Sequence, residues 1–84
     1  MEKITSGLIL PLKLISRSLK TESENSHVIR AGIIKMLEDK MDEVTSIPTE
    51  EIPKIRKLLT EISPVEPRVA EEVNQMIIKF HPNL

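Results

Sequence analysis

Apolar residues recur along most of the chain at intervals of three and four, the spacing that places side chains on one face of an α-helix. Four segments have this pattern, and prolines or short serine-rich stretches separate them. No segment shows the long apolar–polar alternation of a half-buried strand. The pattern therefore predicts an all-α fold, a compact bundle of three or four short amphipathic helices forming a single domain over residues 1–84.

The first segment, residues 1–20, combines apolar and basic residues. Its apolar positions at steps of three and four are Ile4, Leu8, Leu12, Ile15 and Leu19. Pro11 fits the first turn of a helix but would kink a helix that ran through it. The pattern predicts a helix over residues 11–20 and leaves residues 1–10 open between a kinked helix, an extended lead-in and a short strand.

A second helix is predicted from Ser26 to about Val44, after a polar joint in which Ser23 or Ser26 can act as the N-cap. Its apolar stripe is broad and consists of Ile29, Ile33, Met36, Leu37, Met41 and Val44. Arg30 and Lys40 fall inside this stripe. Either their aliphatic stems cover the edge of the core, or one of them forms an ion pair with an acid on a neighbouring helix or a partner chain.

Two further helices follow, each entered through prolines and acids. Thr49 can cap the third, whose apolar residues are Ile52, Ile55, Leu58, Leu59 and Ile62. The fourth begins either at the capping box of residues 63–66 or one turn later at Pro67, and its stripe is Val69, Val73, Met76, Ile77 and Phe80. The joints are short, so we expect consecutive helices to pack roughly antiparallel.

The sequence offers little material for catalysis or for a cofactor. Cysteine is absent, the glycines are Gly7 and Gly32, and neither His27 nor His81 has a second histidine three or four residues away. These features exclude a thiolate metal site, a phosphate-binding glycine loop and the helical zinc motif. We therefore predict a protein that is not an enzyme, with no cofactor and no metal. The acidic cluster of the second helix is interpreted as a solvated face; it consists of Glu38, Asp39, Asp42 and Glu43.

Charge is distributed unevenly, although the net charge is only −1. Residues 1–35 hold six Lys and Arg against three Glu, whereas residues 36–84 hold six against ten acids. Lys13, Arg17 and Lys20 share one side of the first helix, where they could contact phosphates, an acidic protein surface or an anionic membrane. Because the chain has a single aromatic residue for base stacking, nucleic-acid binding is expected to be weak.

Composition also bears on location. No apolar run of about 18 residues exists to span a membrane, and a small secreted domain would usually carry disulfides. We therefore expect a cytoplasmic protein for which the membrane is not the partner. Twelve Ile, eleven Glu and eight Lys suit a thermophile, and an AT-rich genome gives the same bias.

The string from Ser26 to Leu37 resembles the second helix of ribbon-helix-helix DNA-binding proteins, in which a capping serine precedes an Ile-Arg pair. The resemblance covers about 12 residues. It implies an alternating strand upstream, which Ile4–Leu10 could supply, and a DNA-associated function as the alternative to protein binding.

The most informative feature is a surplus of apolar residues between Gly7 and Ile15. At about 100° per residue, Leu10 and Leu14 point away from the main stripe. A helix that is apolar nearly all round is either central in its own core or buried against a partner. The leading hypothesis is a non-enzymatic interaction module: a small accessory subunit that docks on a larger intracellular assembly, such as an archaeal replication or transcription complex, or that forms a homo-oligomer. The predicted partner interface is Leu8, Ile9, Leu10 and Leu14.

Overall fold

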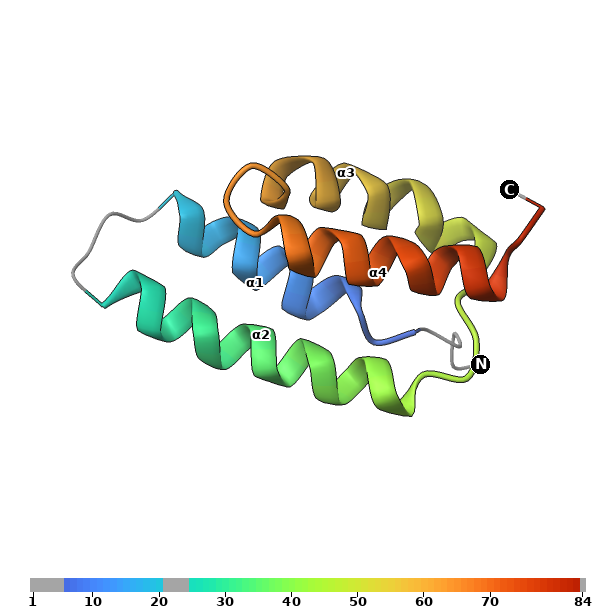
Figure 1. The fold of residues 1–84 in the computed structure, drawn as a ribbon, viewed down its shortest axis with the longest axis horizontal. Helices are drawn as coiled ribbons and strands as arrows, with labels where there is room; N and C mark the ends of the chain where they lie inside the picture. Colours follow the sequence, from blue (N-terminus) through green and yellow to red (C-terminus); the bar gives the residue numbers. More distant parts are fainter. Residues whose placement is uncertain (1–5, 21–24, 84) are drawn as a thin grey trace.

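A computed structural model describes residues 6–20 and 25–83 of the chain. These residues form four α-helices and one short 3-10 turn, and they contain no strand (Figure 1). The elements in chain order are α1 (Ile9–Leu19), α2 (Ser26–Glu43), the 3-10 turn η1 (Thr49–Glu51), α3 (Ile52–Ile62) and α4 (Pro67–Phe80). The predicted all-α bundle is confirmed.

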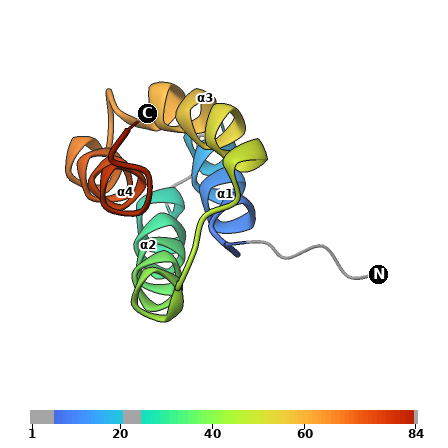
Figure 2. The same ribbon diagram turned by 90° about the vertical axis from the view of Figure 1, so that its right-hand side faces the viewer.

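The helices form two antiparallel pairs that share one core. α1 packs against α2 and α3, while α4 packs against α3 and, over a smaller area, against α2. The expected antiparallel packing of consecutive helices holds for α1–α2 and for α3–α4. α2 and α3 also run in opposite directions (Figure 1), but they do not pack closely against each other as expected, because the connection over residues 44–48 crosses the end of the bundle and places α3 beside α1 instead (Figure 2).

The core lies along the centre of the bundle and draws on every helix. α1 contributes Leu12 and Ile15, and its N-cap residue Leu8 adds a third side chain; none of the three has exposed surface. The predicted stripes of α3 and α4 supply most of the rest: Ile52, Ile55, Leu59, Ile62, Val69, Val73 and Ile77. Leu58, Met76 and Phe80 pack against this core from its edges. α2 adds only one buried side chain, Leu37.

The helix starts differ in detail from the expected caps. α1 begins two residues before Pro11, which still lies in the first turn, where a backbone N–H has no partner in the helix. Asn25 precedes α2 and Ser26 is already helical, whereas Ser23 lies outside the described residues. Thr49 is the first residue of η1 and does not cap it. The fourth helix starts at Pro67, the later of the two predicted positions.

A buried polar contact fixes the start of α1. Ser6 donates from its hydroxyl to Glu51 Oε1 at 2.6 Å, and its backbone N–H faces both carboxylate oxygens at 3.2 and 3.3 Å. The Leu8 N–H in turn donates to Ser6 Oγ at 3.2 Å. Gly7 has a φ of 77°, which favours glycine. Residues 6–8 are therefore a non-helical lead-in that turns Leu8 into the core, while residues 1–5 lie outside the described part.

Candidate interaction surface

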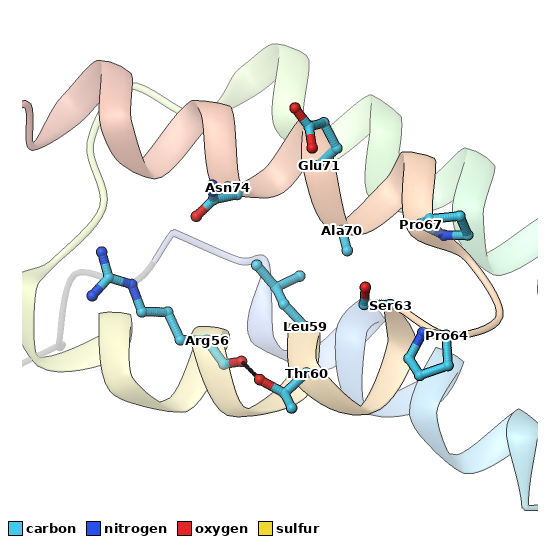
Figure 3. A pocket seen from close by; sticks show the side chains of 9 residues that line it. All are labelled: Arg56, Leu59, Thr60, Ser63, Pro64, Pro67, Ala70, Glu71 and Asn74. Atoms are coloured by element: carbon cyan, nitrogen blue, oxygen red, sulfur yellow. Dashed lines mark hydrogen bonds between the residues drawn. The ribbon is translucent and has the colours of Figure 1, made fainter.

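An open groove of about 640 Å³ lies between α3 and α4. Leu59 and Ala70 point toward each other across it, and Glu71 points away (Figure 3). The Thr60 hydroxyl already has a partner within its own helix, since it donates to the Arg56 carbonyl oxygen at 3.0 Å. Among the described residues, no hydrogen bond joins an α3 side chain to an α4 side chain across this groove.

The titratable residues considered as catalytic candidates are spread over the surface. His27 is exposed, whereas His81 is half-buried and its Nε2–H donates to the Ile47 carbonyl oxygen. This bond ties the end of α4 to the connection after α2, so His81 has a structural contact that the sequence did not indicate. The acidic cluster of α2 is exposed throughout. Within residues 6–20 and 25–83, no three His, Asp or Glu side chains are close enough to hold a metal ion.

The three predicted basic residues lie together on the exposed side of α1. Lys13, Arg17 and Lys20 line a shallow hollow of about 260 Å³ against α3. The same hollow contains Glu61, which accepts a hydrogen bond from Ser16 Oγ at 2.8 Å. The carboxylate reduces the positive potential of this patch, which makes it a weaker phosphate site than three lysine and arginine residues alone would be.

The predicted interface residues of the N-terminal segment separate into two groups. Leu8 has no exposed surface and belongs to the core, so its assignment to a partner interface is wrong. Ile9 is half-buried and packs against the core edge. Leu14 is also half-buried, whereas Leu10 is 65% exposed. Most of the surplus apolar residues are thus at least partly buried within the domain, because α1 packs against helices on two sides. Leu10 remains exposed to solvent.

The exposed apolar residues that sequence reasoning missed lie mainly on α2. Val28 is 60% exposed and Ile29 is 57% exposed, and Met36 is also exposed. The sequence placed Ile29 and Met36 in the core stripe, which is wrong for both. The stripe is too broad for a helix at the edge of the bundle, where α1 and α4 lie on one side only (Figure 2). The breadth of the stripe was the signal that could have identified this surface.

These residues form one continuous face at helical spacing, which we call the α2 outer face: Val28, Ile29, Gly32 and Met36. Gly32 lies four residues after Val28 and four before Met36, so all of them project to the same side. A Cβ built on Gly32 would meet no atom within 4 Å. Leu10 is exposed separately, on α1, where it lines a hollow with Gly7, Ile9, Lys13 and Glu51.

The two cations of the α2 stripe have different surroundings. Arg30 Nε lies 3.3 Å from Glu66 Oε1, just before α4. The predicted pairing with an acid of a neighbouring element therefore occurs for Arg30, but within the chain rather than at a partner interface. Lys40 is exposed, and its Cδ lies 3.8 Å from the Cβ position of Gly7. The stem of Lys40 thus covers the start of α1.

The ribbon-helix-helix arrangement does not occur in the described residues. Its strand was expected over Ile4–Leu10, but Ile9 and Leu10 are helical, and Ser6–Leu8 make no strand pairing. In the described ranges, no helix has both the length and the apolar character needed to cross a lipid bilayer. No protein-family model, curated protein or solved structure matches the chain.

Proposed function

We propose that this domain is a non-catalytic protein-interaction module, a small accessory subunit that binds a protein partner through the α2 outer face and through Leu10 of α1. The observation that carries the proposal is the exposure of α2. This helix has 18 residues, and only Leu37 is buried, while three large apolar side chains of the outer face are exposed. Contiguous apolar surface of this kind is a common mark of a protein-binding site.

The gain from covering this surface is large enough for specific binding. Full burial of one aliphatic side chain stabilises by about 1.5–3 kcal/mol. Leu10, Val28, Ile29 and Met36 have already lost part of their exposure, so covering the remainder is worth about 3–6 kcal/mol together. Each 1.4 kcal/mol changes affinity about tenfold. Losing one of these contacts should therefore weaken binding measurably.

The test is co-purification from the source cells with the tagged domain as bait, followed by identification of the bound proteins. Ile29→Glu should abolish capture, because it places a charge in the centre of the apolar face. Ile78→Glu is the matched control: Ile78 is 47% exposed but lies on α4. Both variants should keep the wild-type circular dichroism spectrum. Equal capture by the two variants, at either the wild-type level or none, would contradict the proposal.

A further inference from the structure

We infer that the seam between α1 and α3 binds an acidic peptide segment of the protein partner. One large apolar side chain of that segment enters a hollow beside Leu10, and its carboxylates lie along the neighbouring basic hollow. This inference rests on the proposed function, since it names the chemistry of the partner at Leu10.

α1 and α3 run in the same direction, side by side (Figures 1 and 2), with a constant register. Ser6 contacts Glu51 at one end of the seam and Ser16 contacts Glu61 further along, and both pairs are separated by 45 residues in sequence. Two hollows follow this seam. One, of about 250 Å³, lies at the start of α1, and the other, of about 260 Å³, lies toward its end. Lys13 lines both hollows, so they adjoin.

The hollow at the start of α1, which we call the apolar hollow, is suited to an aliphatic side chain. Its lining residues are Gly7, Ile9, Leu10, Lys13 and Glu51. Glu51 is buried, and its carboxylate accepts the Ser6 hydroxyl, so this acid is already bonded within the domain. Leu10 is largely exposed. An apolar side chain that enters this hollow would therefore cover Leu10 and remove its surface from water.

The neighbouring hollow, which we call the basic hollow, attracts negative charge. Three cations line it, Lys13, Arg17 and Lys20. Glu61 is the acid among its lining residues, and it accepts a hydrogen bond from Ser16 Oγ at 2.8 Å. Three cations against one carboxylate leave an excess of two positive charges. A segment that carries several carboxylates complements this excess.

The pairing of the two hollows favours a peptide over other anions. Nucleic acids bind proteins chiefly through their phosphates, which complement the basic hollow only. An anionic bilayer takes up apolar side chains that protrude into it, not a hollow. From Leu10 to Arg17 the rise of α1 is about 10 Å, which about three residues of an extended chain span. A leucine followed at that distance by glutamates therefore reaches both hollows.

The test is an NMR titration of the ¹⁵N-labelled chain with three synthetic peptides. Each carries one leucine and four glutamates, separated by one, two or three serines. With at least one of them, the amide signals of residues 7–20 and 58–61 should shift most. The same peptide with glutamine in place of glutamate, or with serine in place of leucine, should bind at least about tenfold more weakly.

Variants of the seam separate the two hollows. Lys13→Glu should weaken binding about tenfold, and Leu10→Ser about fivefold. Lys35→Glu is the control, the same charge reversal on an exposed residue of α2, and it should bind like wild type. Glu61→Gln should tighten binding about threefold, because the amide oxygen can still accept the Ser16 hydroxyl while the negative charge is removed. Circular dichroism should show all four variants folded.

Equal binding of the glutamate and glutamine peptides, or no shift at the seam with any of the three peptides, would overturn the inference. Tighter binding of a short DNA duplex or of phosphatidylserine vesicles, unchanged in Leu10→Ser, would also overturn it, because the basic hollow would then act alone. The proposed function has a separate outcome. It would still stand if Ile29→Glu, but not Ile78→Glu, lost the captured protein.

Discussion

The contact between Ser6 and Glu51 should be a main source of stability at the N-terminal end of the bundle. Glu51 is only 6% exposed, and its carboxylate accepts the Ser6 hydroxyl at 2.6 Å together with the Ser6 backbone N–H. A hydrogen bond to a charged group contributes about 1.5–3 kcal/mol. Ser6→Ala removes the shortest bond and also the acceptor for the Leu8 N–H, so we expect it to lower the free energy of unfolding by about 2–3 kcal/mol.

For a domain of this size, each 1 kcal/mol lowers the melting temperature by about 4–8 °C. Ser6→Ala should therefore lower it by roughly 10–20 °C in a thermal scan followed by circular dichroism. Glu51→Ala should have a similar effect, and the double variant should lose less than the sum, with a coupling of about 1–2 kcal/mol. Glu50→Ala is the control, an exposed acid in the same turn. If all three single variants melt alike, the buried contact does not stabilise the fold.

Three further predictions concern packing. His81→Ala should reduce stability by about 1 kcal/mol, because the Ile47 carbonyl loses its donor, whereas His27→Ala should not; equal urea midpoints for the two would contradict this. Ile62→Ala removes a fully buried side chain and should cost about 2–5 kcal/mol, clearly more than Leu58→Ala at the core edge; chemical denaturation ranks them. Leu8→Ser should unfold the domain or lower its melting temperature strongly, while Leu10→Ser should leave the melting temperature nearly unchanged. A larger loss for Leu10→Ser than for Leu8→Ser would contradict the placement of Leu8 in the core.

The periodicity of the sequence predicted the helices well where a helix has one dominant buried face. α3 and α4 are such helices, because their stripes match the buried residues from Ile52 to Ile62 and from Val69 to Ile77. For α2, periodicity identified the apolar residues but not how many neighbouring helices cover them. That number depends on the path of residues 44–48 across the end of the bundle, which local spacing does not encode.

The polar contacts could not be predicted from the local sequence pattern, for a related reason. Glu51 looks like any acid placed favourably at a helix start, and Ser6 looks like a surface serine. Ser6 and Glu51 are 45 residues apart in sequence, and they meet only because α1 and α3 lie side by side. The pairing of Arg30 with an acid of a neighbouring element was one of the two alternatives for a cation inside an apolar stripe, but the sequence did not indicate Glu66 as the partner.

The parallel placement of α1 beside α3 has a consequence for the order of folding. The α3–α4 pair closes through a short turn, whereas the α1–α3 seam must close a loop of more than 30 residues, which costs more chain entropy. We therefore expect the seam to form late. Ser16→Ala, which removes the bond to Glu61 across that seam, should then accelerate unfolding and leave the refolding rate nearly unchanged in stopped-flow measurements. A slower refolding limb would instead place the seam in the folding nucleus.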